Sequence, residues 1–304
     1  MNNITGDLLF KIGVDKDAFD GAYSLRENGA CSGLKSTDNI KIEKHPEGEG
    51  IVIKISSKTK GEKAYIPACV TKSGINDIVK NDFYIESGAD VKIIAGCGVH
   101  SEEGGHALHS GLHRFFVGDG ASVEYIEKHI GTGTSTDKRI YTESEFVIGK
   151  NANVTVVSEQ IGGVNNALRN TKATLEENSV FTVRERLLTD NDDTVDTVFD
   201  VVLNGEDSKT DVVSRSVARG NSFQKYVSRI EGNAKCTGHT ECDAILAENG
   251  SVEASPCLAA KNGDAELIHE AAIGKIAGEQ IMKLCSLGLT REEAEQKIIE
   301  GFLK

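Results

Sequence analysis

Cysteine, histidine and glutamate residues gather near the C-terminal end of the sequence, in a combination that can bind iron. Residues 236–242 read Cys-Thr-Gly-His-Thr-Glu-Cys, and Cys257, His269 and Glu270 follow them. Thiolate and imidazole groups are good ligands for iron or zinc, whereas carboxylates bind iron more weakly and exchange more readily. A mixed set of these ligands would suit an iron centre that is passed on to another protein.

The spacing within this group limits how its side chains can meet. Cys236 and Cys242 are separated by an even number of positions, so on a regular strand they would lie on one face and His239 on the other. One site built from all three would need a bulge or a turn, which Gly238 could supply. Glu270 comes about one coil later in a solenoid, where neighbouring strands lie ~5 Å apart. The alternative is that Cys242 is a buried small apolar side chain, which is common for cysteine.

A second group of possible ligands lies earlier in the chain. Cys97 is followed by His100, His106, His109 and His113. These side chains could bind zinc or iron in a metal-dependent enzyme built on a β-helix. Because spacing alone does not bring them together, the alternative is a polar loop that binds no metal.

Composition and missing motifs exclude several classes of protein. No GxxxxGKS or GxxxxGKT sequence occurs, so the chain is not a P-loop NTPase, and GxSxG and HExxH are also absent. The formal net charge is −13, which argues against nucleic-acid binding. No apolar stretch approaches ~20 residues and the N-terminus does not resemble a secretory signal. We therefore expect a cytoplasmic protein, without membrane contact, whose 7 cysteines stay reduced.

The elements that must position these groups are predicted to be short strands. Alternating apolar and polar residues, typical of half-buried strands, occur at 50–56, 121–127, 152–157, 181–186 and 210–215. Turns rich in glycine and asparagine separate these runs.

The turns recur along the chain with a variable period. Asn151 and Asn178 are 27 residues apart, whereas Asn249 and Asn262 are only 13 apart, and aligning the runs at 121 and 152 gives a spacing of 31. Such a repeat predicts a solenoid, in which each coil buries its apolar face against the next. A β-sandwich or a β-barrel is the alternative.

Three regions follow from these patterns: a partly helical N-terminal segment at 1–45 with a short helix within 7–19, a β core at 46–270, and a helical region at 271–304. In the last region, Gly288 can end one helix, and Thr290 with Glu293 forms a capping box for the next. On pattern alone, this helical pair caps the solenoid; the alternative is that it docks a partner.

Several motifs, in a fixed order, resemble the SufB/SufD family of SUF-type iron–sulfur cluster assembly proteins. The family's pattern is matched by the runs at 239–243 (His-Thr-Glu-Cys-Asp), 253–256, 265–271, 273–276, 287–294 and 301–302, and upstream by those at 113–118 and 125–129. The similarity covers most of the chain and is strongest from about 235 to 304. The chain is shorter than the better-known bacterial SufB and looks like a compact SufB-like member.

The resemblance implies a fold and partners. Family members form a right-handed parallel β-helix with a C-terminal helical region that binds SufC, an ABC-type ATPase. Two β-helices pair, and ATP-driven closure of the ATPases is thought to reshape the pair and expose the assembly site. The protein would then be a scaffold rather than an enzyme, with Ile281, Leu284 and Phe302 as anchors for the ATPase. A sulfur donor and acceptor apo-proteins would be its other partners.

The resemblance also implies site residues. Cys242 matches the SufB cysteine considered essential for building the cluster, Glu270 the proposed partner ligand, and His269 a histidine of both branches. Cys236, His239 and Cys97 are weaker candidates. A compact chain favours a homodimer over a SufB–SufD heterodimer, and two copies of Cys242 and Glu270 could then hold a [4Fe–4S] cluster, favoured here over [2Fe–2S]. The competing hypotheses are a metal-dependent enzyme using the histidines of 100–113 and a SufD-like partner that binds no cluster.

Overall fold

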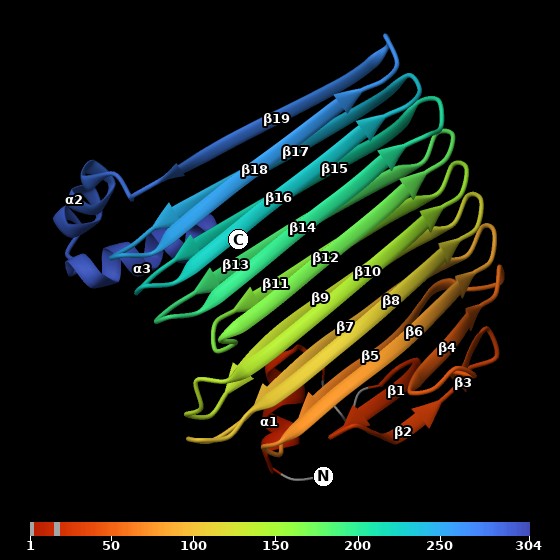
Figure 1. The fold of residues 1–304 in the computed structure, drawn as a ribbon, viewed down its shortest axis with the longest axis horizontal. Coiled ribbons are helices and arrows are strands. Elements are labelled where there is room, and N and C mark those ends of the chain that lie inside the picture. The colour runs from red at the N-terminus through yellow and green to blue at the C-terminus, as the bar shows by residue number, and fades with distance from the viewer. Residues whose placement is uncertain (1–2, 15–18) are drawn as a thin grey trace.

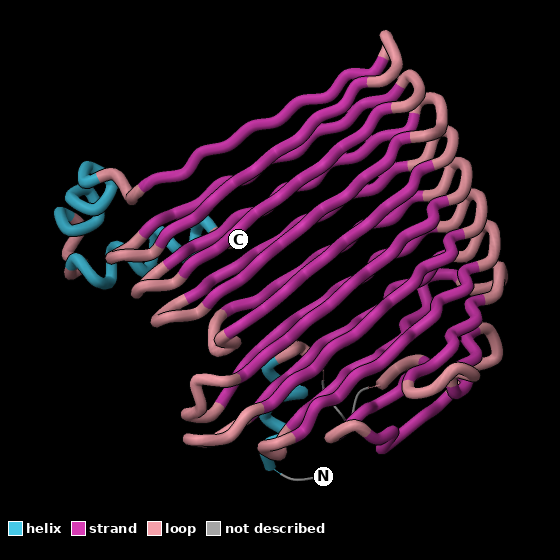
Figure 2. Tube along the Cα trace, viewed as in Figure 1, coloured by secondary structure: helices cyan, strands magenta, loops and turns pink. Residues whose placement is uncertain are grey.

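The computed structural model describes residues 3–14 and 19–304, and these form two long parallel sheets that face each other (Figures 1 and 2). The chain alternates between the sheets, so that each coil adds one strand to each of them. In the 10-stranded first sheet the strands are β1(Ala22–Glu27), β2(Ala30–Lys35), β5(Lys60–Val70), β7(Asp90–His100), β9(Ser122–Thr132), β11(Asn153–Ile161), β13(Val180–Thr189), β15(Ser208–Ala218), β17(Cys236–Leu246) and β19(Ala265–Gly274). In the 9-stranded second sheet they are β3(Ile40–Lys44), β4(Gly50–Ile55), β6(Ile75–Ile85), β8(Ala107–Val117), β10(Lys138–Ile148), β12(Asn166–Leu175), β14(Thr194–Leu203), β16(Phe223–Gly232) and β18(Ser251–Ala260).

The predicted mainly β solenoid is confirmed. From β4 and β5 onward, each strand pairs in parallel with the strand one coil away, which excludes the antiparallel sandwich and barrel. The predicted spacings of 31 and 27 residues are coil repeats, because Ser122 pairs with Asn153 and Asn153 with Val180. The shorter spacing of 13 is half a coil, since Asn249 and Asn262 lie on either side of β18.

Positive backbone φ angles explain why asparagine marks the turns. Asn151 and Asn178 have φ angles of 57° and 55°, a region that asparagine tolerates better than most residues. Other turn asparagines stack between coils, as where the Asn233 side-chain amide donates to the Asn204 side-chain oxygen at 2.8 Å. The turns therefore hold the coils in register as well as reversing the chain.

Stacked aromatic rings fill the middle of the interior. Phe83, Phe115 and Phe146 are register partners on β6, β8 and β10, with ring centroids 4.3 and 4.4 Å apart. Tyr125 reaches them from the opposite sheet, with its ring centroid 4.9 Å from that of Phe115. All four side chains are almost completely buried, so this stack is the centre of the hydrophobic core.

The N-terminal end is closed by two antiparallel pairs, β1 with β2 and β3 with β4, and by helix α1(Asn3–Lys11) on the outer face of the first sheet. The helix approaches β7 closely because Gly98 has no side chain; a Cβ there would lie 3.0 Å from the Leu8 Cβ. α1 begins and ends earlier than the predicted 7–19, because Gly13, with φ of +80°, follows its last turn. Residues 15–18 of that prediction lie outside the described residues, and Phe19 is not helical.

Two short helices, α2(Gly278–Ser286) and α3(Arg291–Phe302), follow β19 and lie beside one end of the strands (Figure 1). The predicted capping box of Thr290 and Glu293 is present, and Gly288 follows α2 with φ of +103°. The helices bury Ile281, Ala294 and Ile299. They leave β18 and β19 exposed, so within the described residues they do not cap the solenoid.

None of the helices in the described part of the chain is both long and apolar enough to cross a bilayer.

Candidate functional site

The parallel pairing of β17 with β19 places the candidate ligands of the last coil. Thr240 lies beside His269, Glu241 beside Glu270, and Cys242 beside Ala271. Side chains alternate between the two faces of a strand. Cys242 and His269 therefore share the inner face, whereas Glu270 points outward.

The expectation that Cys242 and Glu270 lie side by side is therefore wrong for this conformation. One coil at this point takes 29 residues, as the hydrogen bond from the Ala272 backbone N–H to Asp243 shows, whereas Glu270 is one residue short of that spacing. A difference of one residue moves a side chain to the other face of a sheet. The thiol and the carboxylate are thus separated by the sheet itself.

Cys242 is enclosed in the interior, where its side chain is 1% exposed. Burial, and next the negative charge of Glu185, raise the pKa of the Cys242 thiol to about 12, so it is protonated at neutral pH. The neighbouring Ser214 donates a hydrogen bond to Glu185 at 2.6 Å, and Arg169 pairs with Glu185 at 3.3 Å. The polar groups beside Cys242 are therefore already paired with each other.

His269 differs from these paired groups. Its Nδ1 is buried and has no hydrogen-bond partner among the described residues, and burial lowers the pKa of its imidazole. A neutral imidazole with a free nitrogen can accept a proton or bind a metal. The inner face of the last coil thus carries one thiol and one imidazole with a free Nδ1, at an end of the solenoid that nothing in the described chain covers.

The weaker cysteine candidates lie far from Cys242. Cys236 shares the inner face of β17, but six residues along a strand span roughly 20 Å. Cys97 lies on β7, five strands away in the first sheet, or roughly 24 Å at the usual spacing. Cys257 is exposed on β18. All 7 cysteines are described and all are free thiols.

The earlier histidines do not converge on one site. His109 and His113 point into the interior, where His109 Nδ1 lies 3.0 Å from Asp77, and with Cys97 they line a cavity of about 340 Å³. His106 is exposed, and His100 Nδ1 contacts Thr132 Oγ1 at 2.9 Å. The histidine group predicted as a metal site is therefore split between the interior and the surface.

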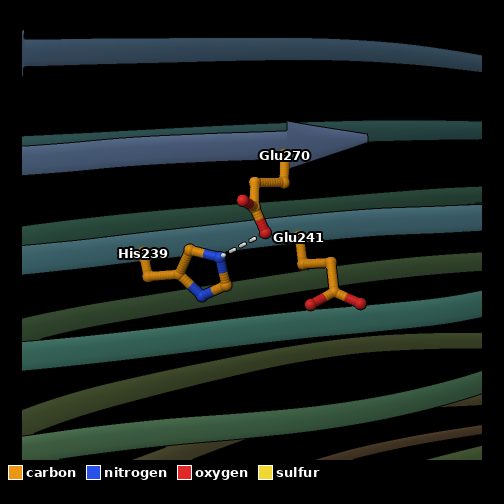
Figure 3. Close-up of side chains that lie close together, drawn as sticks. All are labelled: His239, Glu241 and Glu270. Carbon is orange, nitrogen blue, oxygen red and sulfur yellow. Dashed lines mark ion pairs between the residues drawn. The ribbon is translucent and has the colours of Figure 1, made fainter. Parts of the chain in front are cut away.

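The outer face holds a cluster that the sequence analysis missed in part. His239 Nε2 lies 3.5 Å from a Glu270 carboxylate oxygen, and Glu241 lies next to both (Figure 3). Ligand atoms of the three side chains all lie within 4.8 Å of one another. His239 Nδ1 is 2.7 Å from Asp211 of the previous coil. The sequence analysis named His239 and Glu270 as candidates but neither Glu241 nor Asp211, because the register between coils brings these side chains together.

The family model and the similar proteins all point to the same family. The family described as "SUF system FeS cluster assembly, SufBD core domain" matches residues 76–302. A SufBD family protein of Archaeoglobus fulgidus is 33% identical over 253 residues, which cover 80% of this chain and 66% of that protein. Relatives from Methanothermobacter thermautotrophicus and Methanocaldococcus jannaschii, named in the same way, are 27% and 26% identical, covering 98% and 89% of this chain and 69% and 86% of their own lengths.

The chain thus spans about two thirds of the Archaeoglobus relative. The family match covers most of the solenoid and both C-terminal helices. The chain belongs to the SufBD core domain family of the SUF system of iron–sulfur cluster assembly.

Proposed function

We propose that this protein is a cytoplasmic scaffold on which an iron–sulfur cluster is built and then passed to apo-proteins, with an ABC-type ATPase of the SufC kind as its partner. The cluster is the cargo, its sulfur comes from a donor protein, and the scaffold itself catalyses no ATP hydrolysis. The observation that carries the proposal is the buried Cys242 thiol on the inner face of the uncovered last coil, which it shares with His269, two residues from its register partner Ala271.

Cys242 is the proposed main ligand, and the described conformation is the resting one. Metal ligation needs a thiolate, and a thiol with a pKa of about 12 is protonated at neutral pH. Cluster assembly therefore requires the last coil to open, which would hydrate Cys242 and lower its pKa. A one-residue shift of β19 along β17 would also exchange its two faces and bring Glu270 to the side of Cys242.

A homodimer through the last coil is the proposed assembly. β19 is an edge strand with an unpaired side, and it exposes Ile268 and Ile273 to 54% and 40%. Edge strands of this kind readily pair with another chain. Two copies of Cys242 and Glu270 across a two-fold axis would supply four ligands, the number that an iron–sulfur cluster takes. The cluster that we propose for this site is [4Fe–4S].

The helical pair α2 and α3 is the proposed docking element for the ATPase. Of the predicted anchors, Ile281 is buried, while Leu284 and Phe302 are half-buried. Met282 and Leu287 are 65% and 72% exposed, so they extend the apolar surface that a partner could cover. Deleting residues after Gly288 should leave the solenoid folded and abolish co-purification with the ATPase. Unfolding of the truncated chain would instead give the helices a structural role.

Anaerobic cluster reconstitution tests the scaffold role. Iron and sulfide are counted per chain for the wild type and Cys242→Ala, each with and without the ATPase and ATP, and Cys257→Ala is the control on an exposed cysteine. We expect a labile cluster in the wild type and in Cys257→Ala, and its loss in Cys242→Ala. Equal cluster content in Cys242→Ala would contradict the proposed ligand. No cluster in any sample would favour the SufD-like structural role.

A further inference from the structure

We propose that His239, Glu241 and Glu270 form a mononuclear site for a divalent cation on the outer face of the last coil. Resting on the proposed function, we infer that the cation is ferrous iron, held there before it enters the cluster. This site is separate from the buried thiol, because its three side chains lie on the opposite face of the same two strands.

The geometry supplies three ligands on one side of a possible ion. His239 contributes Nε2, and the two glutamates contribute carboxylate oxygens, with all three ligand atoms within 4.8 Å of one another. Register pairing of Glu241 with Glu270 keeps the two carboxylates on neighbouring strands, and His239 lies two residues before Glu241 on the same face (Figure 3). The remaining coordination positions would be filled by water.

The arrangement around His239 distinguishes this cluster from a chance group of acidic residues. Asp211, one coil earlier, lies 2.7 Å from His239 Nδ1 and so orients the ring with Nε2 toward Glu270. A carboxylate on the far nitrogen of a metal-binding histidine is the usual arrangement in metal sites. Arg184 pairs with Asp211 in turn, so the supporting carboxylate is itself held in place.

The ligand chemistry fits ferrous iron delivered for assembly. One imidazole and two carboxylates form a nitrogen–oxygen ligand set of the kind that binds ferrous iron. Glu270 is exposed and His239 only partly buried, so an ion could enter directly from solvent and leave again. Glu241 lies next to Cys242 in sequence, so a conformational change that turns β17 or β19 would move the ion toward the thiol.

The test is anaerobic equilibrium dialysis against Fe²⁺ alone, with iron counted per chain and folding checked by circular dichroism. Cys242→Ala is the background, because it removes the proposed cluster ligand and leaves the outer face intact. We expect Cys242→Ala to bind Fe²⁺ as the wild type does. The double variant that also carries His239→Ala should not bind it. Asp211→Asn should weaken it about 10–100-fold, as loss of a supporting carboxylate does.

Glu266→Gln is the matched control, since Glu266 is an exposed glutamate on the outer face of β19, four residues before Glu270. It should bind Fe²⁺ as its parent does. Unchanged binding in His239→Ala, or no binding in the folded wild type, would overturn the inference. Binding that is lost in Cys242→Ala but kept in His239→Ala would also overturn it, while leaving the scaffold proposal intact. If the wild type binds Fe²⁺ at this site but never assembles a cluster, the scaffold proposal fails and the cation site stands.

Discussion

The two ends of this solenoid are built from the same coil but finished differently. At the N-terminal end, antiparallel strand pairs and α1 cover the first coils, and the stacked rings of Phe83 and Phe115 fill the interior. At the C-terminal end, the inward side chains of β18 and β19, such as Leu258 and Leu267, are only partly buried. A solenoid coil needs a neighbour to complete its core. The uncovered end is therefore the surface that the proposed dimer would cover, and it is also the place where the candidate ligands lie.

Paired and unpaired polar groups are both found in the interior of the solenoid. Near the N-terminal end, Asp77 is buried between Arg26, at 2.7 Å, and His109, at 3.0 Å. Near the C-terminal end, His269 Nδ1 is buried without a partner. Buried polar atoms in folded proteins are nearly always hydrogen-bonded. Unsatisfied nitrogens also occur in the closed interior, at His113 and His129, so His269 is distinguished by its place in the uncovered coil, where a ligand could reach it.

Truncating the aromatic stack should produce the largest effect on stability. Phe115→Ala removes a ring packed between Phe83 and Phe146, so we expect unfolding to become easier by about 3–5 kcal/mol. Ile268→Ala, on exposed β19, should change the free energy of unfolding of the monomer by no more than about 0.5 kcal/mol. Denaturant titration measures both. Similar costs at the two positions would show that the ends do not differ in packing.

Acid should have the second largest effect, because it lowers the free energy of unfolding through buried histidines in the closed interior. Burial lowers the pKa of His113 from 6.5 to about 4, so the unfolded chain takes up a proton there that the folded chain refuses. Stability is therefore lost as pH falls below 6.5, by about 2 kcal/mol at about pH 5. His129, also buried with a lowered pKa, acts in the same direction, as does Glu127, whose pKa is lowered by His129 and Arg169.

His113→Gln isolates this contribution, because glutamine does not titrate. The free energy of unfolding falls between about pH 7 and about pH 5 in the wild type. In the variant this fall should be smaller by about 2 kcal/mol. An identical pH dependence in the two proteins would remove His113 from the explanation. The same substitution should leave Fe²⁺ binding at the other end unchanged.

A charge on the edge strand should separate the proposed dimer without unfolding the chain. Ile268→Asp places a carboxylate on the exposed β19, and we expect the dimer dissociation constant to rise about tenfold, or about 1.4 kcal/mol. Ile161→Asp is the control, since Ile161 is similarly exposed on β11, away from the last coil. Sedimentation equilibrium measures both variants. A dimer that is weakened equally by the two changes would place the interface elsewhere.

The sequence was sufficient where structure depends on local patterns. Alternation at 121–127 predicted β9 because one face of that strand is buried, and Thr290 with Glu293 predicted the start of α3 because the capping bonds form within one turn. The resemblance identified the family and the residues of the last coil. The predicted N-terminal helix was displaced because Gly13, not the apolar pattern, determines where α1 ends.

The site was harder to predict because it depends on register. Whether Glu270 meets Cys242 or Glu241 is decided by a single residue in coil length, and that length is determined by the turns around β18. Asp211 could not be connected with His239 from spacing alone because coil length varies: Asp211 pairs with His239 after 28 residues, whereas Cys242 pairs with Ala271 after 29. Local patterns thus predict which face a residue takes, and only the pairing of coils shows what it meets there.

The central claim is that Cys242 is the thiol on which the cluster is built, and that its side chain is buried until the last coil opens. The most direct test is its alkylation rate, followed by mass spectrometry with the exposed Cys31 as internal reference, in the chain alone and with the proposed ATPase partner and ATP. The account predicts that Cys31 reacts promptly in both samples, and that Cys242 reacts slowly alone and much faster with the ATPase and ATP. Reaction of Cys242 at the rate of Cys31 in the chain alone, or no acceleration with the ATPase and ATP, would contradict it.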